Sequence, residues 1–499
     1  MDNDDADLLP GWQSGEPAAF AALVRHWQQP IARFLFHLVG QKESVLDLSQ
    51  EVFLRVFLAA PRYHETGQFS AWLYRIALNV VRDFLRGRRP ELKLYHDAEP
   101  LAGSPGPDVC SEQQELARLV SQAVTDLPEP TPAKPFPGKV VPRKDTDMPQ
   151  APAGFNVELY AHDNLKAPRQ IRRSPNGDLF VVETTTGEIK IIRDNNGKPE
   201  ISVFATGLQR PFGVNFYPVG ANPQYVYVGN TGSVVRFAYK NGDLKATGMP
   251  ETLISDLPPN GNHFTRDVVF SKDGSRMFVS VGSADNVSDQ QPVQEHRAVI
   301  LEYAPEGKFT KIYASGIRNP VGLGINPTTG EVWTSVNERD NLGDNLVPDY
   351  ITSVKEGGFY GWPWFYIGKH EDSRAKMERP ADKTIDKVIV PDVLMQPHNA
   401  SLGLTFYDGT QFPQEYRGDL FAAEHGSWNR SNRSGLEVVR VPLNKGKSDG
   451  TYEDFLTGFV TPDGNSWGRP VGVAVGKDGA LYVTDDGSGS IWKVSYTGK

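Results

Sequence analysis

The stretch GRPVGVAVGKDGALYVTDDGSGSIWKVSY, residues 468–496, decides the fold of most of this chain. It contains three short apolar runs, separated by the turn Asp478-Gly479 and by the polar segment DDGSGS. Such runs, joined by glycine, aspartate and asparagine turns, are typical of antiparallel β-strands. Five earlier phrases repeat the pattern and begin at residues 166, 209, 265, 317 and 401.

Repeats of this length predict a β-propeller, in which each sheet buries its faces against its neighbours. The phrases therefore predict six blades. We expect the earlier strand FNVELYA, residues 155–161, to pair with the last blade and close the ring.

The chain begins with a different periodicity. Apolar residues from Phe20 to Leu38 recur at spacings of three and four, which is typical of an amphipathic helix. A second helix is expected from Leu48 to Phe57, and a third from Phe69 to Phe84. The predicted fold class is multidomain, with an N-terminal all-α helical bundle followed by an all-β six-bladed β-propeller. The expected boundaries are 1–90 for the bundle, 91–152 for a linker and 153–499 for the propeller.

The overall composition excludes several classes of protein. The net charge of -9 argues against a protein that coats nucleic acid, although a local basic patch is compatible with it. No run of about 18 apolar residues occurs, so no membrane-spanning helix is expected. The N-terminal MDNDDADLLPGW is acidic where an export signal would be basic and then apolar, so we expect a cytoplasmic product. The single cysteine, Cys110, excludes an internal disulfide.

The third predicted helix has a basic edge opposite its apolar face. Arg75, Asn79, Arg82 and Arg86 follow one another at helical spacing. Such an edge is either a solvated surface or a surface that contacts phosphates. The stretches DLSQEVFLRVF and FSAWLYRIALNVVRDFLRGRR closely resemble the second conserved region of extracytoplasmic-function sigma factors.

This resemblance implies two partners for the bundle. The second helix would dock on the RNA polymerase core, and the third would lie near promoter DNA, with Trp72 in the core of the bundle. The residues implied for these contacts are Asp47, Gln50, Glu51, Asn79, Arg82 and Arg86. Residues 111–127 resemble the opening helix of the family's helix-turn-helix domain, whose remainder is missing before the proline-rich stretch.

In a propeller, polar residues just before the inner strands and just after the middle strands converge on the central axis. These positions predict one shared, strongly cationic funnel whose natural occupant is an anion. The residues are Arg169, Gln209, Asn262, His263, Arg318, Asn319, His398, His425, Arg430 and Arg469.

Several motifs in order carry a second resemblance. GNHFTRDVVFSKDG, GIRNPVGLGINP, EGGFYGWPWF, AEHGSWNR and WGRPVGVAV closely match the glucose and sorbosone dehydrogenase family, from about Pro135 to the end of the chain. Members of that family are six-bladed propellers that hold pyrroloquinoline quinone (PQQ) and calcium. The resemblance therefore implies both cofactors here.

The resemblance also implies roles for individual residues. His263 would be the general base, while Arg318 and Asn319 would stabilise the developing alkoxide. The residues implied for binding PQQ are Arg169, Gln209, Arg318, Asn319, His425, Arg430 and Arg469. Glucose-oxidising members have an aspartate before the base, where this chain has Asn262, so glucose is not assigned as the substrate.

The stretch VNERDNLGD, residues 336–344, occupies the position of the family's calcium loop. The resemblance implies main-chain carbonyls of Glu338 and Arg339 as ligands, and the side chains of Asp340 or Asp344 are the alternative. The segment GGFYGWPW, residues 357–364, is either a structural element or a wall of the substrate site.

Three hypotheses about function follow. In the first, the protein is an oxidoreductase that takes hydride from an aldose, a sorbosone-like aldehyde or a related sugar into PQQ and passes the electrons to an acceptor. In the second, it is a sigma-like transcription regulator whose propeller senses a ligand. In the third, the two parts were joined by an accidental gene fusion.

Overall fold

The computed structural model describes residues 9–12, 17–39, 42–59, 63, 69–85, 138–287, 295–344, 346–368, 370–431 and 433–498. The chain divides into two compact units, one containing the helices and the other the sheets. Multidomain organisation, with helices followed by a β-propeller, is confirmed. Within the described residues, no helix combines the length and the apolar character that crossing a membrane requires.

The described part of the helical unit includes three long helices with apolar faces, as the periodicity predicts. They are α2 (Pro17–Val39), α3 (Lys42–Ala59) and α4 (Phe69–Leu85). Leu23, Phe53 and Leu73 are among the fully buried side chains, one from each helix. Trp72 contacts Tyr63, with ring centroids 4.7 Å apart, and so belongs to the aromatic core of the bundle as expected. Arg86 and the segment 111–127 lie outside the described residues.

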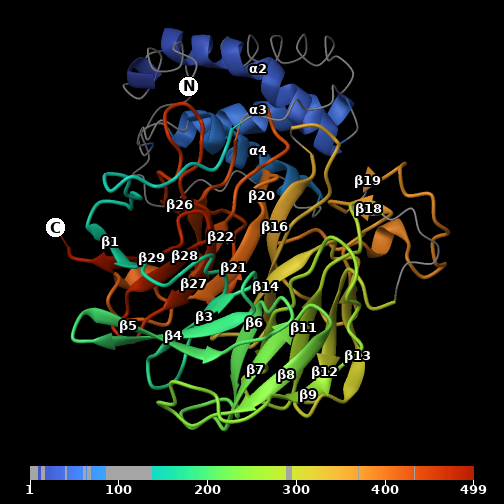
Figure 1. Ribbon diagram of the computed structural model, residues 1–499. Helices are drawn as coiled ribbons and strands as arrows, with labels where there is room; N and C mark the ends of the chain where they lie inside the picture. Colours follow the sequence, from blue (N-terminus) through green and yellow to red (C-terminus); the bar gives the residue numbers. More distant parts are fainter. Residues whose placement is uncertain are drawn as a thin grey trace. The chain divides into compact units, whose positions relative to one another are not determined.

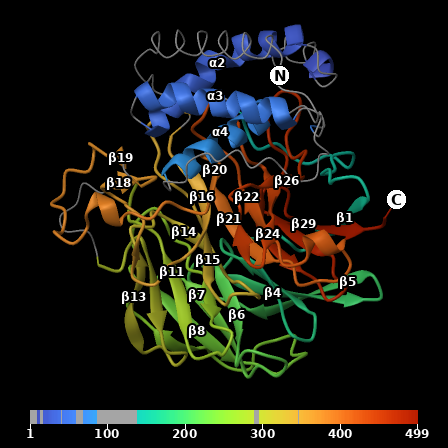
Figure 2. The ribbon, with the colours of Figure 1, turned by 180° about the vertical axis from the view of Figure 1, so that it is seen from behind.

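The described part of the second unit contains six large sheets, which form the six predicted blades (Figures 1 and 2). In the first blade, consecutive strands run antiparallel. The first blade consists of β2 (Ile171–Arg173), β3 (Leu179–Glu183), β4 (Glu188–Asn195) and β5 (Lys198–Ala205). The second consists of β6 (Gly213–Tyr217), β7 (Tyr225–Asn230), β8 (Ser233–Ala238) and β9 (Glu251–Ile254).

The third blade has five strands, because the two-residue strand β17 pairs in parallel with β13. Its strands are β10 (Val268–Phe270), β11 (Met277–Val281), β12 (Val299–Tyr303), β13 (Phe309–Ser315) and β17 (Gly358–Phe359). The fourth blade consists of β14 (Pro320–Ile325), β15 (Val332–Val336), β16 (Pro348–Ser353) and β20 (Val393–Pro397).

The fifth blade consists of β21 (Ser401–Phe406), β22 (Leu420–Glu424), β23 (Glu437–Val441) and β26 (Glu453–Leu456). Short hairpins pair β18 (Phe365–Tyr366) with β19 (His370–Glu371), and β24 (Leu443–Asn444) with β25 (Lys447–Ser448). Single 3-10 turns occupy η2 (Ile385–Lys387) and η3 (Gln414–Tyr416).

The sixth blade closes the ring. Its strands β27 (Pro470–Val475), β28 (Leu481–Asp485) and β29 (Ser490–Tyr496) come from the stretch of residues 468–496. The fourth strand is β1 (Phe155–Ala161), which pairs antiparallel with β29. The predicted closure is therefore confirmed, and it joins two segments from opposite ends of the propeller sequence.

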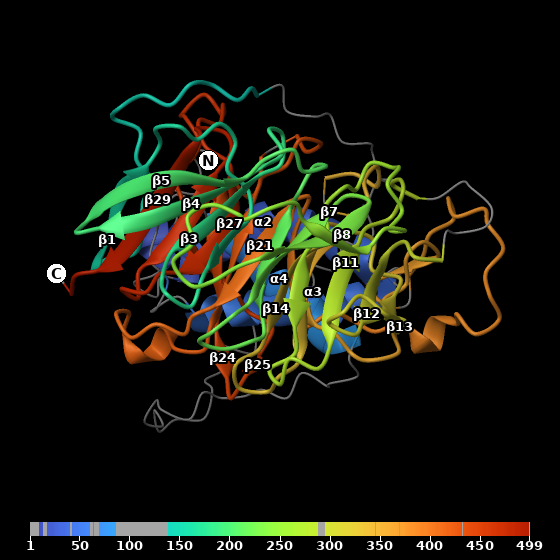
Figure 3. The same cartoon turned by 60° about the horizontal axis from the view of Figure 1, so that its bottom comes forward.

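A glycine recurs in four of the inner strands for a steric reason. A Cβ atom at Gly213, Gly322, Gly403 or Gly472 would lie within 3.0 Å of a main-chain oxygen of the neighbouring blade. Glycine therefore lets the inner strands pack closely around the axis. Figure 3, turned so that the bottom of the ring comes forward, shows the inner strands β14, β21 and β27 side by side. This packing brings the residues that precede the inner strands to one end of the ring.

Candidate functional site

The predicted general base, His263, precedes β10 and is held in one orientation. Its Nδ1 lies 2.9 Å from both the carbonyl oxygen and the hydroxyl oxygen of Ser283. Because a carbonyl oxygen can only accept, Nδ1–H is the donor and Nε2 keeps its lone pair. Burial, followed by the positive charge of Arg318, lowers the pKa of His263 to about 3. The ring is therefore a neutral proton acceptor.

Gly282 lets His263 and Asn319 come together. A Cβ atom at this position would lie 2.6 Å from the Cβ of His263 and closer still to Oδ1 of Asn319. Among the described residues, that Oδ1 atom is buried without a hydrogen-bond partner. An amide oxygen in this state is suited to accept a hydrogen bond from a ligand hydroxyl. The sequence analysis did not identify Gly282.

Arg318 is buried and points into a frame of oxygen atoms. Its guanidinium donates to the carbonyl oxygens of Asn286 and Glu338, at 3.2 and 2.5 Å. It also donates to Oδ1 of Asn286 and pairs with the carboxylate of Asp340, each at 3.0 Å. These contacts fix the arginine beside His263. Sequence reasoning missed Asn286, which lies in the ordinary-looking loop SADN.

Asp340 connects this arginine to the loop before the fifth blade. Its Oδ1 accepts a 2.6 Å hydrogen bond from Nδ2 of Asn429 and lies 3.5 Å from Nδ1 of His398. Burial alone would raise the pKa of Asp340, but the bond to His398 and the charge of Arg318 hold it below its ordinary value. The carboxylate is therefore ionised. It connects Arg318 to His398, which precedes the fifth blade, and to Asn429, which lies between β22 and β23.

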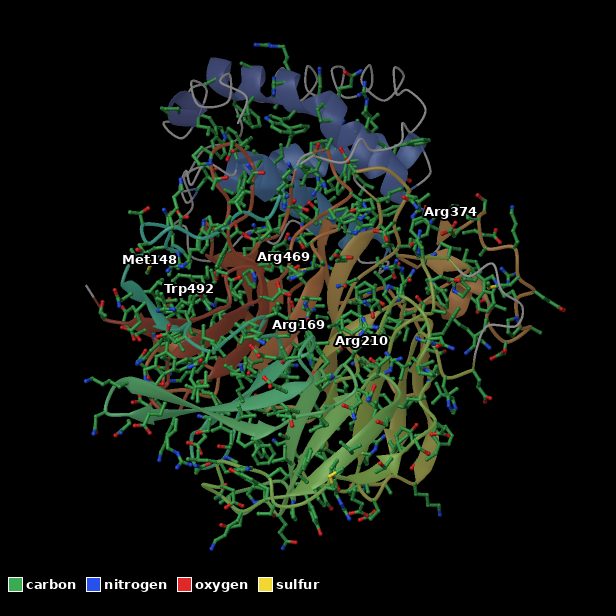
Figure 4. The ribbon with its side chains drawn as sticks, in the orientation of Figure 1. Met148, Arg169, Arg210, Arg374, Arg469 and Trp492 are labelled. Carbon is green, nitrogen blue, oxygen red and sulfur yellow. The ribbon has the colours of Figure 1, made fainter. Side chains whose placement is uncertain are left out.

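A second cluster surrounds Asp486, which the sequence analysis also missed. Its carboxylate pairs with Arg169 and accepts a 2.9 Å hydrogen bond from Nε2 of His425, whose Nδ1 lies 2.8 Å from Arg469. Burial, more than any charge, lowers the pKa of His425 to about 4, so this ring is neutral. Arg169 and Arg469 are both labelled in Figure 4. The cluster unites three of the residues predicted to bind the anion.

Two other predicted residues lie at the rim. Gln209 is exposed, and Arg430 donates to the carbonyl oxygen of Pro397 at 3.5 Å. Next to Gln209, the guanidinium carbon of Arg210 lies 4.0 Å from the centre of the Phe264 ring. Arg210 adds a cation that sequence reasoning had not selected, and Figure 4 shows it on the same side of the sheets as Arg169.

Comparison with known proteins agrees with this geometry. The model of the family described as Glucose / Sorbosone dehydrogenase matches residues 165–493, about two thirds of the chain. The chain belongs to the glucose/sorbosone dehydrogenase family. A separate family model, Sigma-70 region 2, matches residues 23–91.

Relatives of each part are found in bacteria. An uncharacterized protein of Borreliella burgdorferi is 30% identical over 360 residues, which cover 70% of this chain and 92% of the relative. An aldose sugar dehydrogenase of Escherichia coli is 25% identical over 376 residues, or 69% of this chain and 94% of the relative. The N-terminal part is 28% identical over 135 residues to the RNA polymerase sigma-H factor of Pseudomonas aeruginosa, covering 25% of this chain and 70% of that factor.

The solved PQQ domain of pyranose dehydrogenase from Coprinopsis cinerea has the same fold. It superimposes with a TM-score of 0.59 at 24% identity and covers 72% of this chain and 99% of that domain. This likeness supports the propeller fold of the second unit.

The residues at the funnel fit a ligand with several carboxylates. Arg169, Arg210 and Arg469 supply guanidinium groups, and Nε of Arg169 is buried without a hydrogen-bond partner among the described residues. Guanidinium groups bind carboxylates through paired hydrogen bonds. These groups lie at the same end of the ring as His263, so they could hold PQQ with its reactive atoms near the base.

The segment predicted to bind calcium, residues 336–344, is internally bonded. The carbonyl oxygen of Glu338 accepts from Arg318, and its carboxylate pairs with Nε of Arg339 at 3.0 Å. The Arg339 side chain is buried and donates to the carbonyl oxygen of Phe365 at 2.7 Å. In the described part of the chain, no three His, Cys, Asp or Glu side chains form a metal-binding group. Calcium held by main-chain oxygens of Glu338 and Arg339 stays a prediction.

The segment GGFYGWPW, residues 357–364, packs against the loop that holds Arg318. Trp362 and Trp364 are buried, and the Trp362 indole donates to the carbonyl oxygen of Asn286 at 3.0 Å. The segment therefore supports the loop that holds Arg318. Its role as a wall of the substrate site stays a prediction.

Contacts to polymerase and DNA stay predictions. In the helical unit, Glu51 pairs with Arg55 one turn along α3, at 2.7 Å. Nη1 of Arg82 lies 3.2 Å from Oδ1 of Asn79 on α4, so these two predicted DNA-contacting residues form a local pair. Asp47 and Gln50 lie on α3 with Glu51.

Proposed function

We propose that the propeller oxidises an aldose or a related sugar aldehyde with PQQ, assisted by calcium. The observation that carries this proposal is the orientation of His263, whose Nδ1 is bonded to Ser283 while Nε2 keeps its lone pair beside Arg318. The names of two relatives, aldose sugar dehydrogenase and PQQ-dependent pyranose dehydrogenase, support a sugar as the substrate.

The chain's own residues would perform the proton chemistry. Nε2 of His263 accepts the proton of the substrate hydroxyl, and Asn319 and Arg318 lie beside the oxygen that becomes negative. Arg169 and Arg469 would hold the carboxylates of the cofactor, and carbonyl oxygens of Glu338 and Arg339 would hold calcium. Bound PQQ supplies the quinone carbon that accepts the hydride.

Replacing His263 with alanine tests this proposal. The full-length protein, loaded with PQQ and calcium, should reduce a dye with aldoses as donors. His263→Ala should lower kcat by roughly 10²–10⁴-fold, the range for loss of a general base, without changing PQQ affinity. His162→Ala, at an exposed histidine of the same unit, is the matched control.

Two results would contradict the proposal. One is a wild-type protein that gives no PQQ absorbance change at micromolar cofactor. The other is a His263→Ala variant that keeps the wild-type kcat. Removing calcium with a chelator should abolish dye reduction and restoring it should recover the rate, which tests the calcium requirement separately.

A second function, binding of RNA polymerase by the helical unit, is supported by the Sigma-70 region 2 match over residues 23–91. We propose that α3 contacts the polymerase core through Asp47, Gln50 and Glu51. The tagged full-length protein should then retain purified core enzyme, and a variant with all three residues changed to alanine should not. Retention of no core by the wild-type protein would argue against this function.

A further inference from the structure

Trp428 is an exposed aromatic side chain in the loop His425–Ser434. Its relative exposure is 69%, the highest of any tryptophan or phenylalanine in the described part of the chain. Its neighbours Ser427 and Asn429 are buried, at 5% and 7%. An indole therefore projects outward from a loop whose adjacent side chains turn inward.

Hydrogen bonds hold this loop on both sides of the tryptophan. Ser427 N–H donates to the carbonyl oxygen of Ser434, and Ser434 N–H donates to Oγ of Ser427, at 2.9 and 3.0 Å. Nδ2 of Asn429 donates to Asp340, and Ser431 N–H donates to Asp344, at 2.6 and 2.9 Å. The main chain around Trp428 is therefore fixed by contacts that lie next to it in sequence.

The same loop contacts both clusters of the candidate site. At its start, His425 bonds to Asp486 and Arg469. One residue after Trp428, Asn429 bonds to Asp340, which holds Arg318. Trp428 is thus placed between His425, which reaches the cluster around Asp486, and Asn429, which reaches Asp340. Trp428 therefore stands at the rim of the site.

We propose that Trp428 is the platform on which the ring of the sugar substrate packs. This inference rests on the proposed sugar oxidation and deepens it, because it assigns a ring-form sugar as the substrate class. A pyranose has an apolar C–H face and a rim of hydroxyl groups, so it pairs with a flat, rigid indole on one side and polar groups on the other. Asn319 and His263 supply the polar side.

The geometry of the loop favours a role of Trp428 in substrate binding over an exposed side chain without a function. Single exposed apolar residues are common on protein surfaces. Here, however, buried polar neighbours on both sides fix the main chain at Trp428. The loops to which these neighbours bond carry predicted catalytic and anion-binding groups. A fixed aromatic surface binds a ring with little loss of side-chain entropy.

Trp428→Ala and Trp428→Phe test the proposal in steady-state kinetics of the PQQ-loaded protein. For a ring-forming aldose, Trp428→Ala should raise KM about 10-fold and change kcat less than threefold, while Trp428→Phe should recover most of the loss. KM for glyceraldehyde, which forms no six-membered ring, should stay unchanged. Phe309→Ala removes another exposed aromatic, on β13, and is the matched control.

A binding measurement decides the question without turnover. 1,5-Anhydroglucitol, a ring sugar without an anomeric hydroxyl, is titrated into the full-length protein with and without PQQ by calorimetry. The dissociation constant should rise about 10-fold in Trp428→Ala. Equal binding to wild type and Trp428→Ala, or equal KM changes for glyceraldehyde and the aldose, would overturn the platform. If the protein oxidises no sugar, the proposed function fails, and the titration still tests the platform.

Discussion

His263 and Asn319 meet across Gly282, and the absence of a side chain at that position sets their separation. Both residues come from loops of different blades, and each would be displaced by a methyl group between them. A well-packed site responds to such an insertion by moving side chains off their preferred positions, which costs about 1–3 kcal/mol. The position of His263 thus depends on Gly282, which has no side chain and takes no part in the reaction.

Gly282→Ala should therefore lower kcat/KM at least 10-fold and leave the propeller folded. The expected cause is a shift of His263 away from the substrate hydroxyl. Steady-state kinetics together with circular dichroism check this result. Gly232→Ala is the control, because the nearest atom to its Cβ would be the Pro259 Cβ at 3.3 Å. Equal activity of the two variants would show that Gly282 does not position the base.

The sequence predicted residues whose chemistry is distinctive and missed those whose role comes from contacts. His263 and Arg318 stand in motifs that mark them out. Asn286 and Asp486 stand in the turn-like stretches SADN and VTDDG, and only the folded chain shows that they hold Arg318 and His425. Gly282 could have been noticed only as a glycine directly after a strand.

At the level of elements, the repeated sequence pattern predicted the six blades. Alternating apolar residues and hairpin turns define each inner and middle strand, and β1 closes the ring as predicted. The fifth strand of the third blade was not predictable, because β17 is two residues long and pairs across a gap in sequence with β13. Its segment GGFYGWPW carries two buried tryptophans, so its role depends on tertiary packing.

For the whole propeller, buried groups with opposite pKa shifts make the free energy of unfolding depend on pH. Burial, and then the charge of Asp349, raises the pKa of Glu424 to about 8, and burial raises that of Asp349 to about 7. Such acids keep their protons in the folded state, so their stabilising contribution is complete at low pH and is lost as pH rises through these values. His263 and His425, with lowered pKa values, contribute stability above their ordinary pKa of 6.5 and lose it as pH falls.

Between pH 7 and 8, both acids lose protons, and Glu424 contributes the larger part of the change because it holds its proton over more of the interval than Asp349. Glu424 should lower the unfolding free energy by about 1 kcal/mol across this interval. Glu424→Gln should remove most of that fall and leave the smaller contribution of Asp349, because a glutamine carries no proton to lose and can keep hydrogen bonds to Ser401, whose hydroxyl lies 2.7 Å from Oε2. Denaturant unfolding at both pH values measures the difference. Glu306→Gln, at an exposed glutamate, should behave as wild type. A Glu424→Gln variant that lost stability as steeply as wild type would place the titrating group elsewhere in the molecule.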